Sequence, residues 1–392
     1  MRVAFVVQRY GLEINGGAEL HCRWIAEHMR RHWEVEVLTT RGLDYITWEN
    51  HYPAGEDTVN GVRVRRFSVR RPRDPEKFGR LQNFILGSEH TEADEWKWVE
   101  EQGPYSPDLI DFIKSHRGDY DRFVFFSYRY YHSMHGILAL PEKSVLVPTA
   151  ERDAVIGLRI FKEIFRRPLA IVYNSEEERE MIGALSRNRD VPGDVVGVGA
   201  EVPQNVPVSD FRARYGLEGD YLIYIGRIDR NKGCDQLFDF FVRFKRESGS
   251  PVKLVLVGST VLKIPPHPDI VYLGFLPEPD KFAALSEASL LVMPSFFESL
   301  SMVATEAWAM GKPVLANARC EVLSGRCRRS RAGLDYAGYA EFREALSLLL
   351  EDDRLRTRMG ENGRAYFRAE YTWDRIERKY IDLFDRIGGA AS

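Results

Sequence analysis

Two glutamates, Glu298 and Glu306, are separated by seven residues in an apolar segment, PSFFESLSMVATEAWAMGKPVLAN, residues 294–317. The preceding run LLVM is typical of a buried strand, and Ser299 or Ser301 can cap a following helix. Glu298 then lies in a loop at a strand end, and Glu306 lies about two turns into the helix. Burying an unpaired carboxylate is costly, so a binding site would explain both residues. Two ordinary roles stay open: a helix-start carboxylate for Glu298 and a solvent-facing position for Glu306.

Two cations follow another predicted strand. Arg227 and Lys232 lie in YIGRIDRNKGCDQLFDFF, between the run YLIYIG and an amphipathic helix. Arginine offers a planar fork and lysine a compact charge, and together they suit a diphosphate. For either residue alone, a solvated loop cation is the common alternative.

Near the N-terminus, the loop QRYGLEINGGAE brings Gly16 and Gly17 to the start of a predicted helix. Adjacent glycines let backbone N–H groups approach a ligand, and a helix N-terminus favours an anion, so a phosphate or a developing oxyanion suits this loop. The spacing is not G-x-G-x-x-G, which makes a nicotinamide site a weak interpretation. A glycine turn that only allows tight packing is the alternative.

Short β-rich runs alternate with amphipathic helical stretches along most of the chain, which predicts an α/β fold with two Rossmann-like domains. The first series of strands is expected at 3–8, 35–40, 62–69, 123–128, 144–150, 169–175 and 194–199. The second series is YLIYIG, VKLVLVG, IVYLG, LLVMPS and PVLAN. We expect domains at 1–202 and 203–372, followed by a terminal helix over 373–388. In such domains ligands bind at the carboxyl ends of the strands, here facing a central cleft.

Composition excludes several classes of function. The 392 residues carry a net charge of -3, which gives no general attraction to nucleic acid. The four cysteines form no C-x-x-C pair, and the short D-x-D match at 119–121 is predicted to be a turn, so no metal site is assigned. No apolar run approaches the ~20 residues needed to cross a bilayer, and the N-terminal residues lack the apolar core of a signal peptide. The expected location is the cytoplasm.

The order of these motifs resembles a known family. GRIDRNKG followed by ESLSMVATE is similar to the signature of the retaining GT-B glycosyltransferases of family 4, also called glycosyl transferases group 1. GGAE, YNSEEERE, GKPVLAN and TWDRIERKY extend the resemblance over nearly the whole chain. The last of these resembles a segment that crosses back, which implies that the helix 373–388 rejoins the first domain. It implies the GT-B fold and metal-independent transfer of a sugar from a nucleotide-sugar donor, a UDP- or GDP-sugar, with no other cofactor. The implied acceptor is a saccharide or lipid-linked saccharide, as in polysaccharide or lipopolysaccharide assembly.

The resemblance also implies a role for each candidate residue. Arg227 and Lys232 would hold the donor diphosphate and stabilise it as a leaving group. Glu298 would bind hydroxyls of the donor sugar, and Glu306 would bind those of the ribose. The remaining positions expected to contact the donor are Gly16, Gly17, Gly226, Gly258, Phe275, Leu276, Leu300 and Ser301.

One departure concerns the acceptor side. Many relatives carry a histidine after the strand SVLVPTA, where this chain has Glu151 followed by Arg152. The carboxylate of Glu151 can contact a donor hydroxyl or carry a proton, and a structural pair with Arg152 is the alternative. Tyr105 and His132 are the candidate acceptor-binding residues, with aromatic packing and a structural histidine as their ordinary roles.

Three further interpretations stay open. The segments 155–168 and 63–73 mix apolar and basic residues, which would suit peripheral contact with the anionic inner face of the cytoplasmic membrane. The alternative to membrane contact, a buried helix with a solvated basic side, is the favoured interpretation. A nucleotide-binding, non-catalytic partner of a glycosylation complex and a nucleotide-sugar epimerase or hydrolase are the alternative functions.

Overall fold

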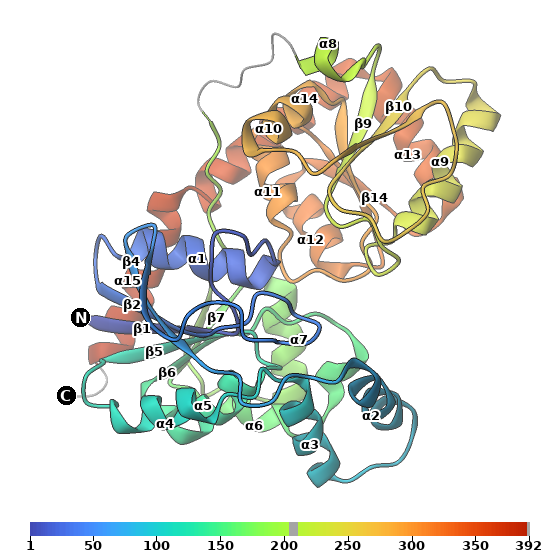
Figure 1. The fold of residues 1–392 in the computed structure, drawn as a ribbon. Helices are drawn as coiled ribbons and strands as arrows, with labels where there is room; N and C mark the ends of the chain where they lie inside the picture. The colour runs from blue at the N-terminus through green and yellow to red at the C-terminus, as the bar shows by residue number, and fades with distance from the viewer. Residues whose placement is uncertain (204–210, 390–392) are drawn as a thin grey trace. The chain divides into compact units, whose positions relative to one another are not determined.

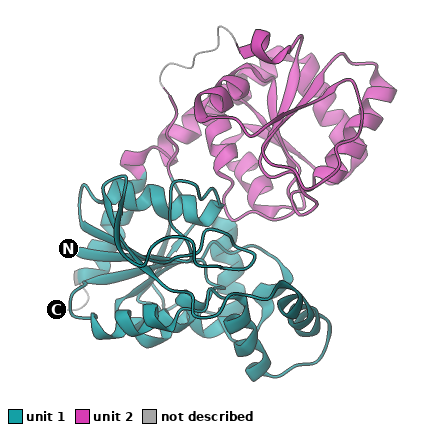
Figure 2. Ribbon diagram, viewed as in Figure 1, with its two compact units in different colours: residues 1–198, 376–392 teal, residues 199–375 magenta. Residues whose placement is uncertain are grey.

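The chain forms two units, each built on a mainly parallel sheet with helices packed on it (Figure 1). The computed structural model describes residues 1–203 and 211–389. One unit consists of Met1–Val198 together with Ile376–Ser392, and the other is Gly199–Arg375 (Figure 2). The predicted α/β class with two Rossmann-like sheets is confirmed.

The sheet of unit 1 has the strand order β3-β4-β2-β1-β5-β6-β7-β8. Its strands are β1 (Arg2–Val7), β2 (Glu34–Thr40), β3 (Gly55–Val59), β4 (Val62–Phe67), β5 (Arg122–Phe126), β6 (Ser144–Val147), β7 (Ala170–Tyr173) and β8 (Gly193–Val195). Only β3 pairs in an antiparallel manner, with β4. Sequence patterns missed β3 because GEDTV is polar and only Val59 in it is buried.

Seven α-helices of unit 1 come before residue 199. An eighth, α15, begins at the end of unit 2 and lies mainly in unit 1. They are α1 (Gly17–Met29), α2 (Pro75–Gly87), α3 (Glu92–Gln102), α4 (Pro107–Ser115), α5 (Tyr131–Ala139), α6 (Phe161–Arg166), α7 (Glu176–Ser186) and α15 (Trp373–Gly389). Five apolar side chains of α15 are at most 3% exposed: Ile376, Tyr380, Leu383, Phe384 and Ile387. Phe384 packs on Trp33 of unit 1 with ring centroids 4.5 Å apart.

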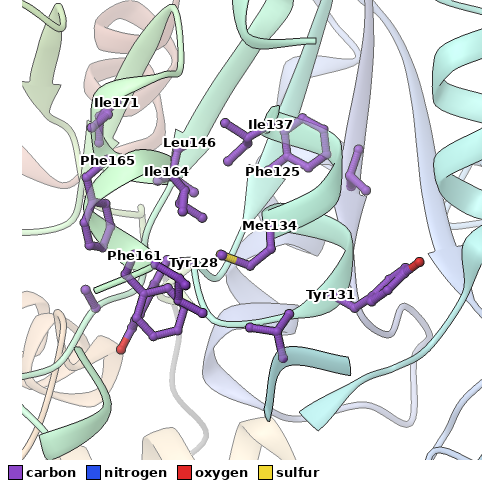
Figure 3. Close-up of a cluster of buried hydrophobic side chains, with 14 of the residues drawn as sticks. Phe125, Tyr128, Tyr131, Met134, Ile137, Leu146, Phe161, Ile164, Phe165 and Ile171 are labelled. Atoms are coloured by element: carbon purple, nitrogen blue, oxygen red, sulfur yellow. The ribbon is translucent and has the colours of Figure 1, made fainter. Parts of the chain in front are cut away.

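Figure 3 shows the core of unit 1 where α5 and α6 pack against the sheet. Ile164 and Phe165 of α6 belong to this core, and Ile156 and Ile160 are at most 6% exposed. The apolar residues of 155–168 are therefore core residues, which leaves only the basic side of this segment at the surface. Of the helices in the described residues, none is both long and apolar enough to span a bilayer.

The sheet of unit 2 is entirely parallel, in the order β11-β10-β9-β12-β13-β14. Its strands are β9 (Tyr221–Ile225), β10 (Lys253–Val257), β11 (Ile270–Gly274), β12 (Leu290–Met293), β13 (Val314–Asn317) and β14 (Gly333–Tyr336). The described helices are α8 (Phe211–Tyr215), α9 (Cys234–Ser248), α10 (Glu278–Glu287), α11 (Met302–Ala309), α12 (Glu321–Ser330), α13 (Tyr339–Glu351) and α14 (Asp353–Glu370). Strand β14 was missed because GLDY is short and lacks a clear apolar pattern.

Candidate functional site

The backbone at the carboxyl edge of the unit 2 sheet makes an unusually close approach. Gly226 follows β9 with φ of 153°, and Gly258 follows β10 with φ of 130°. A Cβ atom on Gly258 would lie 2.0 Å from the carbonyl oxygen of Gly226. Any side chain at Gly258 would therefore separate the two strand ends. This edge is where ligands of open α/β sheets usually bind.

The loop after β9 is organised by Asp229, which sequence reasoning missed. Asp229 is 6% exposed, forms an ion pair with Arg227 and accepts a hydrogen bond of 2.7 Å from the backbone N–H of Lys232. Tyr224 donates to the carbonyl oxygen of Arg227 at 2.7 Å. The side chain of Arg227 is still 43% exposed, so an anionic ligand can reach its guanidinium.

Two of the predicted residues meet directly. The ammonium group of Lys232 lies 2.7 Å from a carboxylate oxygen of Glu298, which follows β12. Their side chains are 30% and 12% exposed. The turn of Gly233 makes this approach possible, since a Cβ atom there would lie 2.1 Å from the carbonyl oxygen of Pro294. Loops after β9 and β12, neighbouring strands, thus place a cation and a carboxylate together.

Glu306 is 3% exposed, which makes its solvent-facing alternative wrong. One carboxylate oxygen lies 2.9 Å from the ammonium group of Lys281, a partner that sequence reasoning missed. The other oxygen has no hydrogen-bond partner among the described residues. Burial raises the pKa of the Glu306 carboxyl, and the charge of Lys281 opposes this shift.

The start of α11 is capped by Ser301, one of the two serines expected to do so. Its hydroxyl accepts a hydrogen bond from the N–H of Ala304 at 3.4 Å, and its φ of 68° is unusual for a residue with a side chain. Leu300 and Leu276 are buried, so their backbones are the groups that can meet a ligand. Phe275 is 72% exposed and offers a ring face for stacking.

In unit 1, Gly16 makes room for a buried ion pair. A Cβ atom on Gly16 would lie 2.3 Å from a carboxylate oxygen of Glu19, which pairs with Arg9 at 2.6 Å. Both charged residues are less than 10% exposed. Around Gly17, no described atom lies within 4 Å of a Cβ position, so its backbone at the start of α1 is accessible from that side. The Arg9–Glu19 pair carries no local signal in the sequence.

Glu151 follows a strand end that a second glutamate holds in place. The carboxyl group of Glu178 accepts hydrogen bonds of 2.5 Å from the N–H of Ala150 and from the N–H of Asn174. Glu178 is 1% exposed, and burial raises its pKa to about 8. Glu151 itself is half-buried. The carboxyl ends of β6 and β7 are therefore joined by a buried carboxyl group next to the candidate residue.

His132 and Tyr105 have the contacts of packed residues. The Nε2–H of His132 donates to the carbonyl oxygen of Phe126 at 2.9 Å, the residue has no exposed surface, and burial lowers its pKa to about 4. The ring of Tyr105 lies edge-on to Tyr131 at 5.1 Å, with the guanidinium of Arg71 over it at 4.7 Å. Their acceptor-binding roles stay predictions, and the structure favours the ordinary role for His132.

The D-x-D match lies in a turn before β5, where Asp121 accepts a hydrogen bond of 2.7 Å from the N–H of Arg2. Within residues 1–203 and 211–389, no group of three or more His, Cys, Asp or Glu side chains is arranged to hold a metal ion. All four cysteines are buried.

Comparison with known sequences finds a family match over most of unit 2. Residues 209–366 match the family described as glycosyl transferases group 1. A D-inositol 3-phosphate glycosyltransferase of Nocardia farcinica is 33% identical over 54% of this chain, which spans 51% of that relative. An uncharacterised glycosyltransferase of Methanocaldococcus jannaschii is 23% identical over 98% of both chains.

Solved structures share the fold over the full length. Sucrose-phosphate synthase from Thermosynechococcus elongatus superposes with a TM-score of 0.74 at 18% identity, covering 99% of both chains. Anabaena HepE in complex with UDP-glucose gives a TM-score of 0.71 at 16% identity, covering 98% of this chain and 100% of HepE. These likenesses confirm the fold predicted from the motifs. Residues 209–366, most of unit 2, therefore match the group 1 glycosyltransferases, and the chain as a whole has the GT-B fold.

Proposed function

We propose that the protein transfers a sugar from a UDP- or GDP-sugar to a saccharide or lipid-linked saccharide, with retention of configuration and without a metal ion. The observation that carries this proposal is the Lys232–Glu298 pair beside Arg227 at the carboxyl edge of β9 and β12. Such an edge combines cations for a diphosphate with a carboxylate for sugar hydroxyls. The proposed use is the assembly of a polysaccharide or lipopolysaccharide.

The proposed chemistry depends on the leaving group. The bond between the anomeric carbon and the phosphate oxygen breaks, and its electron pair stays on the diphosphate. The acceptor hydroxyl attacks the anomeric carbon from the same face, and its proton passes to the departing phosphate oxygen. Arg227 and Lys232 stabilise the negative charge that develops on the diphosphate, which lowers the barrier because this charge grows toward the transition state.

Both cations already have carboxylate partners, Asp229 and Glu298. These partners hold the cations in place before the donor arrives, and phosphate oxygens then share them through charge-assisted hydrogen bonds. Among the described contacts, Lys232 engages one oxygen of Glu298, and the second oxygen is proposed to accept from a sugar hydroxyl. The unpartnered oxygen of Glu306 is proposed to accept from a ribose hydroxyl in the same way.

Support for the choice of substrates comes from the relatives. HepE, whose fold this chain shares, was solved with UDP-glucose, which favours testing UDP-sugars first. The relatives include a D-inositol 3-phosphate glycosyltransferase and an alpha-D-kanosaminyltransferase, whose names differ in the sugar or the acceptor they specify.

We propose a cytoplasmic location, with electrostatic contact with an anionic membrane surface when the acceptor is lipid-linked. Arg166 and Arg167 of α6, with side chains 43% and 58% exposed, support such contact.

A donor screen tests the proposal. Purified protein is incubated with UDP-, GDP-, ADP- and dTDP-sugars in EDTA, and thermal stability and release of nucleoside diphosphate are measured. One donor is expected to raise the unfolding temperature and to be turned over, whereas Arg227→Ala and Glu298→Ala abolish turnover. Arg230→Ala is the matched control, because Arg230 lies in the same loop with its side chain 81% exposed.

Four outcomes would contradict parts of the proposal. If no nucleotide or nucleotide sugar binds, the diphosphate site is misidentified. If free sugar forms without an acceptor, the protein is a nucleotide-sugar hydrolase rather than a transferase. An inverted anomeric configuration in the product, measured by NMR, excludes the retaining mechanism, and activity lost in EDTA but restored by a divalent cation excludes metal independence.

A further inference from the structure

Arg326, in α12, is a fully buried arginine that contacts the turn before α11. It has no exposed surface. One terminal nitrogen donates to the carbonyl oxygens of Leu300 and Ser301, the latter at 3.0 Å. The other donates to the hydroxyl of Thr305 at 2.7 Å. A single guanidinium thus joins both residues of the turn to the first part of α11.

The positive charge of Arg326 is buried without a carboxylate. Its guanidinium carbon lies 4.7 Å from the ring centre of Trp308 and 4.8 Å from that of Tyr371. Among the described residues, no carboxylate forms an ion pair with it, and its Nε has no hydrogen-bond partner. Burying a cation is costly, and carbonyl and ring contacts offset only part of that cost. A role beyond packing would explain why an arginine occupies this position.

The contacts of Arg326 determine where the neighbouring N–H groups point. In a trans peptide, the carbonyl and the following N–H point in opposite directions. The carbonyls of Leu300 and Ser301 both face Arg326, so the N–H groups of Ser301 and Met302 face away from it. The first N–H groups of a helix have no acceptor within the helix and favour an anion. The φ of 68° at Ser301 needs support from its surroundings, which Arg326 supplies.

We propose that Arg326 is a positioning residue for the donor diphosphate, which holds the Leu300–Ser301 turn so that the N–H groups of Ser301 and Met302 face the phosphate. This inference rests on the proposed donor site and adds a residue that would not touch the donor. The buried charge behind the turn also makes the potential at the phosphate more positive.

The experiment compares binding of diphosphates with binding of nucleosides. The probes are UDP, GDP and ADP, each measured by titration calorimetry, and uridine, guanosine and adenosine, each measured by ligand-observed NMR. The variants are Arg326→Met, which removes the charge, and Arg326→Lys, which keeps a cation but lacks the fork that reaches three acceptors. Arg328→Met, on the exposed side of the same helix, is the matched control. Thermal unfolding establishes that each variant is folded.

We expect both Arg326 variants to bind the preferred diphosphate at least tenfold more weakly than the wild type, with nucleoside affinity within twofold. A residue that only stabilises the fold would not separate phosphate from nucleoside in this way. Unchanged diphosphate affinity, or a parallel loss for nucleoside and diphosphate, overturns the inference and leaves the donor site standing. If the wild type binds none of the three diphosphates, the donor site falls and the inference falls with it.

Discussion

The carboxyl edges of the two sheets use polar residues in opposite ways. In unit 2, the side chains of Arg227 and Lys232 are partly exposed and pair with carboxylates whose side chains are at most 12% exposed. In unit 1, burial lowers the pKa of His21 to about 3 and that of His132 to about 4, and raises that of Glu178 to about 8. These three groups are therefore mainly neutral near pH 7, in contrast to the buried Arg9–Glu19 ion pair of the same unit. Similar sheets can therefore carry partly exposed cations at one carboxyl edge, called the charged edge below, and buried neutral groups at the other, called the neutral edge.

Removing a cation from the charged edge is expected to have the largest effect. Lys232→Ala leaves Glu298 without its partner and takes one positive charge from the leaving group, so we expect kcat/KM to fall by about 10²- to 10³-fold. The measurement is steady-state turnover of the donor found in the screen. Arg230→Ala should stay within threefold of the wild type. If kcat/KM falls by less than threefold in Lys232→Ala, the ammonium group at this edge does not stabilise the leaving group.

The neutral edge can be tested through Glu178. The fold favours its protonated form, so its contribution to stability is complete below the ordinary pKa of 4.5 and is lost as the pH rises toward about 8. Linkage predicts a loss on the order of 3 kcal/mol in the free energy of unfolding between pH 5 and pH 8 that Glu178→Gln does not show. Urea denaturation at both pH values measures it. Glu180 is exposed on the same helix, so Glu180→Gln should show the same change in the free energy of unfolding with pH as the wild type. If this change is the same in all three proteins, Glu178 is ionised in the folded protein.

The close approach of Gly226 and Gly258 belongs to the charged edge, where β9 and β10 are each followed by glycine. Gly258→Ala combines an unfavourable φ with a contact of 2.0 Å to Gly226, and we expect it to lower the free energy of unfolding by about 2 to 3 kcal/mol. Gly274→Ala is the control: its φ is 71°, no described atom crowds it, and a cost of about 1 kcal/mol is expected. Equal shifts in Tm would show that the strand ends separate easily.

The smallest effect is expected at His132. His132→Gln keeps a donor for the carbonyl oxygen of Phe126, so we expect a loss of about 1 kcal/mol in stability and an acceptor KM within twofold of the wild type. Acceptor kinetics at saturating donor provide the measurement. A tenfold rise in acceptor KM with an unchanged Tm would restore the acceptor-binding role and make the neutral edge part of the active site.

Local patterns in the sequence predicted what local physics determines. Continuous apolar runs predicted most of the buried parallel strands, and the serine before an apolar helix predicted the cap at Ser301. The motif order predicted that Arg227, Lys232 and Glu298 belong to one site, although the Lys232–Glu298 contact joins residues 66 positions apart. This prediction came from the family resemblance, since no periodicity in the sequence links residues so far apart.

What escaped prediction depends on tertiary contacts. Lys281 lies on a different helix from Glu306, and the guanidinium of Arg326 reaches a turn 25 positions earlier in the chain. Lys281 and Arg326 belong to no recognisable motif. From the sequence alone, each would be interpreted as an ordinary exposed cation on a helix. Polar strands such as β3 escape for a related reason, because they are stabilised by pairing with a neighbour and carry little apolar pattern of their own.

The return of α15 to unit 1 has a consequence for the order of synthesis. Unit 2 is continuous in sequence, so it can fold as soon as it leaves the ribosome, whereas unit 1 lacks α15 until the whole of unit 2 has been made. During that interval the surface around Trp33, which Phe384 later covers, is open to solvent and to chaperones. Translation speed across 199–375 therefore sets how long unit 1 waits incomplete.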